Sequence, residues 1–99
     1  MAQYIYKIQP VRPAMLVASW PEEDVVIEEH FLYLQKLTEQ GVVQLAGRTL
    51  VTDSRSFGIV IFEAESDEAA EKIVQNDPAV QKRMMRAEWF PFRVALQSG

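Results

Sequence analysis

The sequence predicts an α+β fold in which strands and helices follow one another in the order β-α-β-β-α-β. Short runs rich in β-branched and aromatic residues alternate with two longer amphipathic segments. Both longer segments begin after a serine and carry acidic residues in their first turn, as helix starts do. The chain has 99 residues, of which 48% are hydrophobic, so we expect a single domain over residues 1–99.

The first half of the chain is expected to form a strand, a loop, a long helix and a second strand. Their ranges are residues 4–9, 12–20, 21–40 and 42–47. Ser19 precedes Glu22 by three residues, which is the spacing of a capping box at a helix start. Gly41 suits the end of the helix because glycine readily adopts the left-handed conformation found there. The loop has prolines at its start and no helical period, so we expect extended backbone around Met15.

The second half is expected to form a turn, a third strand, a second helix and a fourth strand. The turn covers residues 52–56 and the third strand residues 57–64. The second helix begins at Ser66, and the fourth strand covers residues 88–96. The third strand is almost continuously apolar, which is typical of a central strand. The helix ends before Pro78, because the residue before a proline leaves the helical region, and a short helical turn is expected within 79–85. Pro91 cannot donate to a sheet ladder, which places the fourth strand at an edge or gives it a bulge.

This order of elements is the split βαβ, or ferredoxin-like, arrangement. Right-handed crossovers place both helices on one face of a four-stranded antiparallel sheet. The opposite face has no cover from this chain, and residues 59–62 are apolar on both sides of their strand. An exposed apolar sheet face favours self-association. We therefore expect a homodimer in which the two sheets pack face to face.

Composition argues against several classes of function. Ten Lys and Arg against fourteen Asp and Glu give a formal charge of −4, with no basic stripe for nucleic acid. The longest uncharged apolar stretch, residues 13–21, is too short to span a bilayer, and the N-terminus lacks the pattern of a signal peptide. The chain has no Cys, which excludes disulfides. We expect a cytoplasmic protein that binds neither nucleic acid nor membranes.

The single histidine, His30, is the first candidate functional residue. At about 100° per residue it lies near the centre of the apolar stripe of the first helix, facing the sheet or its edge. It can be a core histidine whose ring nitrogens are satisfied by hydrogen bonds. It can also be a general acid or base, because histidine titrates near neutral pH. A metal site is disfavoured, since the chain has no second His and no Cys.

Asp77 and Arg48 are the other two candidates, and each has two interpretations. Asp77 stands before Pro78, where an aspartate commonly accepts backbone hydrogen bonds and closes a helix. The functional alternative is a carboxylate that orients His30 and stabilises its protonated form. Arg48 follows Gly47 at a strand end, where it can be a solvated surface charge or can aim a guanidinium at an anionic ligand.

Five segments occur in an order and spacing that are typical of one family. They are EEHFLYLQKLTEQG (28–41), AG (46–47), FGIVIF (57–62), SDEAA (66–70) and NDP (76–78). Together they resemble the YciI-like, or YCII-related domain, family over essentially the whole chain. The resemblance implies a ferredoxin-like fold that forms dimeric α/β barrels. It also implies that His30 and Asp77 are a pair that lines a pocket.

The sequence departs from the family pattern in three places. Arg48 stands where many members have a proline after the glycine, residues 53–56 lack the usual Asp-Pro and glycine, and residues 82–84 lack the glycine that usually follows the Asp-Pro turn. Replacing proline and glycine by arginine near the expected pocket would narrow it or add positive charge. Because of these differences, the substrate of a relative is not assigned to this protein.

The resemblance also implies a class of chemistry. A few similar proteins are lyases or dehalogenating enzymes that act on aromatic ring compounds, and related barrels include muconolactone isomerases. We expect a cofactor-independent lyase or isomerase in which His30 moves a proton, Asp77 orients it and Arg48 binds a small anionic or cyclic substrate. No glycine-rich phosphate loop is present to hold a nucleotide. The alternative is a non-catalytic dimeric module that binds a small ligand or a protein.

Overall fold

Four strands form one antiparallel sheet in the order β2-β3-β1-β4. The computed structural model describes residues 1–99. The strands are β1 (Ala2–Pro10), β2 (Val43–Arg48), β3 (Gly58–Ala64) and β4 (Met85–Phe92). β1 pairs with both β3 and β4, while β2 pairs only with β3. The expected α+β fold is thus confirmed, with the apolar strand β3 at a central position and the proline-containing strand β4 at an edge.

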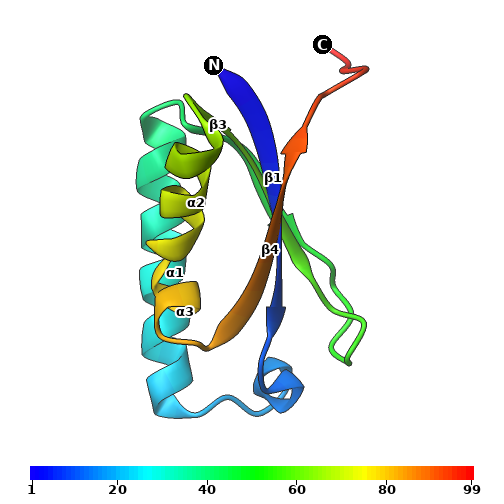
Figure 1. Ribbon diagram of the computed structural model, residues 1–99. Helices are drawn as coiled ribbons and strands as arrows, with labels where there is room; N and C mark the ends of the chain where they lie inside the picture. The colour runs from blue at the N-terminus through cyan, green and yellow to red at the C-terminus, as the bar shows by residue number, and fades with distance from the viewer.

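The three α-helices cover one face of this sheet, and no helix covers the opposite face (Figure 1). The helices are α1 (Pro21–Glu39), α2 (Asp67–Gln75) and the short α3 (Pro78–Gln81). α3 is the helical turn expected after Pro78, and it packs against α1. At the lower end of Figure 1, the backbone of the β2–β3 hairpin diverges from α1. No helix has both the length and the hydrophobicity that a membrane span requires.

The core lies between the sheet and the helices. Along β1 and β3 every second side chain is buried against the helices, as expected for strands with one covered face. Tyr4 and Tyr6 of β1 both pack on Phe62 of β3, with ring centroids 5.7 Å apart in each pair. Leu34 of α1 and Val74 of α2 complete the same cluster. Burial of these side chains anchors α1 and α2 to the sheet.

The start of α1 at Pro21 matches the sequence-based expectation, but the capping residue differs by one position. The N-cap is Trp20, not Ser19, and the side chain of Glu23 accepts the backbone N–H of Trp20 at 2.8 Å. The hydroxyl of Ser19 donates instead to Asp24 at 2.6 Å. Arg12 selects this arrangement, because its guanidinium binds Glu23 and stacks 3.7 Å from the Trp20 ring centroid. The other end matches the expectation, with Gly41 at a φ of +77°.

Two further segments differ from expectation. Residues 13–16 form a 3-10 helix rather than extended backbone, because Met15 is buried and its N–H bonds to the carbonyl of Arg12 at 3.0 Å. The fourth strand begins at Met85 and ends at Phe92, so it lies several residues earlier than 88–96. The cause is the length of β1, which continues to Pro10 and pairs there with Met85.

The open face of the sheet carries a row of apolar side chains that crosses all four strands. Ile5 of β1 stands opposite Ile61 of β3 on one side and Phe90 of β4 on the other, and Ile61 stands opposite Leu45 of β2. Leu45 and Phe90 are 52% and 50% exposed. The expectation of large apolar residues on the uncovered face is therefore confirmed for the single chain.

Candidate active site

The side chains of His30 and Asp77 are in direct contact. His30 lies in the middle of α1, and Asp77 is the N-cap residue of α3, which packs beside α1. The Nδ1 atom of His30 is 2.8 Å from Oδ1 and 2.8 Å from Oδ2 of Asp77. The carboxylate of Asp77 is fully buried, while the His30 side chain retains 12% exposure. The structure thus joins two candidates that are 47 positions apart in the chain.

Asp77 holds its place because its carboxylate also satisfies neighbouring groups. Its Oδ1 accepts the backbone N–H of Ala79 at 3.0 Å, which starts α3 after Pro78. Its Oδ2 accepts the hydroxyl proton of Tyr6 at 2.8 Å. An aspartate before a proline favours this local turn, so the turn interpretation of Asp77 is confirmed, and the carboxylate also contacts His30. The same carboxylate caps a helix and binds the histidine.

The pairing determines which ring nitrogen of His30 is available. An ionised carboxylate only accepts hydrogen bonds, so the facing Nδ1 atom must carry a proton. In the neutral ring, Nε2 is then the unprotonated atom and can accept a proton. No other side chain or backbone group of the protein bonds to the ring of His30. This is the arrangement in which a histidine can act as a base supported by a carboxylate.

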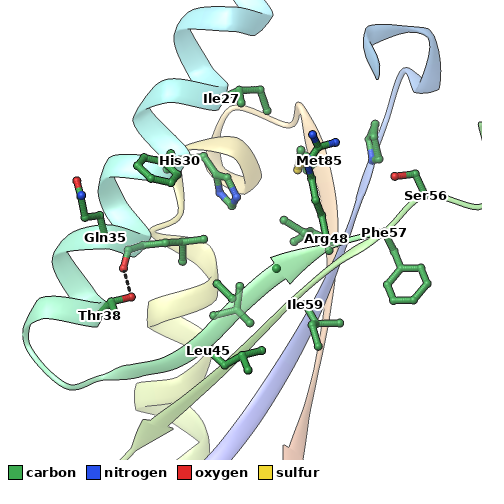
Figure 2. A pocket seen from close by; sticks show the side chains of 18 of the residues that line it. Ile27, His30, Gln35, Thr38, Leu45, Arg48, Ser56, Phe57, Ile59 and Met85 are labelled. Atoms are coloured by element: carbon green, nitrogen blue, oxygen red, sulfur yellow. Dashed lines mark hydrogen bonds between the residues drawn. The ribbon is translucent and has the colours of Figure 1, made fainter. Parts of the chain in front are cut away.

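His30 forms part of the wall of a cavity of about 800 Å³ between α1 and the diverging strands β2 and β3 (Figure 2). Most of the wall is apolar, with Ile27 and Phe31 from α1 and Ile8 from β1 among its members. Polar side chains interrupt this wall. They are Gln35, Thr38, Glu39, Gln44, Arg48 and Ser56. The volume and the mixture of apolar walls with few polar groups suit a small organic molecule.

Arg48 lines the same cavity from the opposite side (Figure 2). It is the last residue of β2 and stands opposite Gly58 in β3, on the sheet face that α1 covers. A Cβ at Gly58 would lie 3.1 Å from Ile8, so the glycine allows Ile8 to pack closely against β3 beside Arg48. None of the hydrogen bonds or ion pairs within the chain involves the Arg48 guanidinium. A planar cation without an internal partner suits an anionic oxygen of a ligand.

Burial and the Asp77 carboxylate make the nearby tyrosines harder to ionise. Burial, together with the Asp77 carboxylate, raises the pKa of Tyr6 well above its usual value of 10.0. Burial and the same carboxylate raise the pKa of Tyr33 to about 12. Both phenols therefore stay protonated above the pH at which a free tyrosine ionises, and the hydroxyl of Tyr33 donates to the carbonyl of Ile73 at 2.6 Å.

The structure brings His30 and Arg48 to one cavity, with Asp77 behind His30 and not itself in the cavity wall. Sequence analysis missed Tyr6 as a neighbour of the site. Its position on the covered face follows from the alternation of residues 4, 6 and 8, yet no local signal identifies Asp77 as its partner 71 positions away. No group of three or more His, Cys, Asp or Glu side chains is arranged to hold a metal ion.

Solved structures of similar fold include two that align over more than nine-tenths of both chains. One is 5-chloro-2-hydroxyhydroquinone dehydrochlorinase from Burkholderia phenoliruptrix AC1100 in complex with 2,5-dihydroxybenzoquinone, with a TM-score of 0.59 and 22% identity over 91% of this chain and 93% of that chain. The other is the uncharacterized protein TM1266 from Thermotoga maritima, with a TM-score of 0.60 and 12% identity over 93% and 98% of the two chains. No curated protein matches the sequence. The sequence pattern of the YCII-related domain matches residues 4–92, and the chain therefore belongs to the YCII-related domain family.

Proposed function

We propose that the protein is a cofactor-independent acid–base enzyme of lyase or isomerase type that acts on a small anionic or cyclic compound. The observation that carries the proposal is the orientation of His30, whose Nδ1 is occupied by Asp77 while the ring borders a cavity shared with Arg48. A solved structure of similar fold is a dehydrochlorinase bound to 2,5-dihydroxybenzoquinone, which supports a ring compound as the substrate class.

In the proposed reaction, Nε2 of His30 removes a proton from a carbon next to a carbonyl group. The electron pair of the broken C–H bond forms an enolate, whose oxygen Arg48 stabilises. In an elimination, the enolate electrons then form a carbon–carbon double bond and expel a leaving group with its bonding pair. In an isomerisation, the imidazolium returns the proton to a different carbon. Asp77 stabilises the imidazolium in both cases.

The experiment is a screen of small cyclic carbonyl compounds for exchange of carbon-bound protons with deuterated solvent. We expect exchange with the wild-type protein, loss of it in His30→Gln, and weaker substrate binding in Arg48→Gln. Lys36→Ala is the control, because this residue of α1 does not line the cavity. Exchange that persists in folded His30→Gln would contradict the proposal. The first compound to be tested for binding is 2,5-dihydroxybenzoquinone, and its binding is monitored through the NMR resonances of His30.

The second candidate is a non-catalytic module that binds a small ligand or a protein. The observation that favours it is the structural use of Asp77, whose buried carboxylate caps α3 as well as binding His30. A module of this kind binds the quinone probe but catalyses no proton exchange in any compound of the screen. In such a module His30→Gln lowers stability, and neither the wild-type protein nor the variant shows turnover.

We further propose that the protein is a homodimer through the open sheet face. The apolar row of Leu45, Ile61, Ile5 and Phe90 supports this, because side chains of this kind are rarely left together in water. Ile61→Glu places a charge in the middle of the row, and we expect it to yield monomers in analytical ultracentrifugation. Val25→Glu, on an exposed part of α1, is the control and should not change the mass. A monomeric wild-type protein would overturn this proposal.

A further inference from the structure

We infer that Tyr6 is a positioning residue of the site, whose buried hydroxyl holds the Asp77 carboxylate in the orientation that keeps a proton on Nδ1 of His30. This role concerns the tautomer of the His30 ring. The effect of Tyr6 on turnover rests on the proposed function.

The geometry of the Asp77 carboxylate is determined by donors from three parts of the chain. Tyr6 of β1 donates to Oδ2 at 2.8 Å, the N–H of Ala79 in α3 donates to Oδ1 at 3.0 Å, and His30 of α1 faces both oxygens at 2.8 Å. The torsion between Cβ and Cγ of an aspartate is broad and has no sharp intrinsic minimum. Without the Tyr6 hydroxyl, nothing but His30 itself contacts Oδ2, and only Oδ1 keeps a donor besides His30, so the carboxylate plane is less restrained.

The hydroxyl of Tyr6 has no other role in the fold. The ring packs edge-on against Phe62 at 5.7 Å, and a phenylalanine would make the same contact. Tyr6 is fully buried, and a buried hydroxyl is unfavourable unless it is hydrogen-bonded. Its only partner is Asp77. Burial and the carboxylate also raise the pKa of this phenol, so it remains a donor and does not compete with His30 as a base.

The other charged and titratable groups near His30 and Asp77 do not donate to the Asp77 carboxylate. Tyr33 is held away by its bond to the carbonyl of Ile73. Lys82 and Glu29 form an exposed ion pair with each other at 2.8 Å. Arg48 lines the cavity in front of His30 and does not contact Asp77. Only Tyr6 adds a side-chain donor to the carboxylate besides His30 itself.

Tyr4 provides a matched control within the same strand. It lies on the same face of β1, packs on the same Phe62 ring at 5.7 Å, and donates to Asp67 at 2.7 Å. Asp67 is exposed at the start of α2 and does not contact His30. Removing the Tyr4 hydroxyl therefore removes a tyrosine–aspartate hydrogen bond of similar length without touching the site.

The experiment compares Tyr6→Phe and Tyr4→Phe by nitrogen-15 NMR of the single imidazole ring. In the wild-type protein and in Tyr4→Phe we expect the neutral ring to carry its proton on Nδ1. In Tyr6→Phe we expect a mixture of both neutral tautomers and exchange of the Nδ1 proton with water that is about tenfold faster, as loss of one hydrogen bond to a charged group implies. An unchanged tautomer and exchange rate in folded Tyr6→Phe would overturn the inference.

A second measurement covers the case in which Tyr6→Phe does not fold. Incorporation of 3-fluorotyrosine keeps every hydroxyl but makes it a stronger donor, so the Nδ1 proton resonance of His30 should shift, and Tyr4→Phe should leave that shift in place. No shift would overturn the inference. Neither measurement needs a substrate, so a failed screen for proton exchange contradicts the proposed function alone. If a substrate is found, Tyr6→Phe should lower kcat more than it raises KM.

Discussion

Tyr4 and Tyr6 project from the same face of β1, and each gives its hydroxyl proton to an aspartate. The bond to Asp67 raises the pKa of Tyr4, and burial together with Asp77 raises the pKa of Tyr6. The third tyrosine of the chain, Tyr33, has its pKa raised to about 12. All the tyrosines of the protein are therefore harder to ionise when it is folded.

This predicts an unusual alkaline titration. An unfolded chain ionises its tyrosines around pH 10, whereas the folded protein resists ionisation there. Because the unfolded state loses the protons first, stability is intact below about pH 10 and falls as the pH rises toward the raised values. We expect tyrosinate absorbance to stay low at pH 10 and to rise together with loss of the circular dichroism signal. Ionisation of one tyrosine near pH 10 in the folded protein would contradict this.

Asp77→Ala should be strongly destabilising. It leaves the Tyr6 hydroxyl and the Ala79 N–H without an acceptor inside the core, and each unpaired buried donor costs about 1–3 kcal/mol. Asp67→Ala removes the partner of Tyr4 at an exposed position, and we expect a loss of about 1 kcal/mol or less. Urea unfolding of both variants measures the difference. Equal losses would show that burial of Asp77 does not matter.

Glu23→Gln should change the acid sensitivity of the protein. The hydrogen bonds from Arg12 lower the pKa of Glu23 below its usual value of 4.5. The resulting stability is present above about pH 4.5 and is lost as the pH falls through the lowered value in the folded state. The gap in Tm between wild type and Glu23→Gln should therefore be widest near neutral pH and close in acid. A gap that is constant with pH would contradict the ion pair.

Two neighbouring glycines should respond oppositely to alanine. A Cβ at Gly58 would lie 3.1 Å from Ile8 and 3.2 Å from the carbonyl oxygen of Gly47, so Gly58→Ala strains the floor of the cavity. We expect a loss of about 1–3 kcal/mol, or several degrees in Tm. A Cβ at Gly47 meets nothing within 4 Å. Gly47→Ala should be neutral or slightly stabilising, and equal effects in calorimetry would contradict this account of the cavity.

The fold was predictable because its signals are local. The apolar stripe of α1 and the apolar run of β3 depend on residues a few positions apart, and they are enough to give the order of elements and the central place of β3. The 3-10 helix after Arg12 and the cap at Trp20 were not predictable in this way. The 3-10 helix depends on burial of Met15 in the folded protein, and the cap depends on a contact from Arg12 to Glu23, which lies 11 positions further along the chain.

The site was predictable only in part for the same reason. His30 stands out as the single histidine on an apolar face, and the family resemblance paired it with Asp77. The hydroxyl of Tyr6 reaches Asp77 across 71 positions, and this contact exists only once β1 and α3 are packed. The direction of the free Arg48 side chain likewise depends on the pairing of β2 with β3, which places it on the covered face opposite Gly58.

The double use of Asp77 has a consequence for how this protein can change during evolution. A mutation at Asp77 uncaps α3 and leaves buried donors unpaired, so it is removed by selection for folding whether or not the chemistry is needed. His30 is not part of the helix cap, and a lineage that abandons the reaction can replace it by another residue that fills the same space and donates a hydrogen bond to Asp77. The histidine, and not the aspartate, is therefore the position whose retention or loss records whether descendants still use the cavity for chemistry.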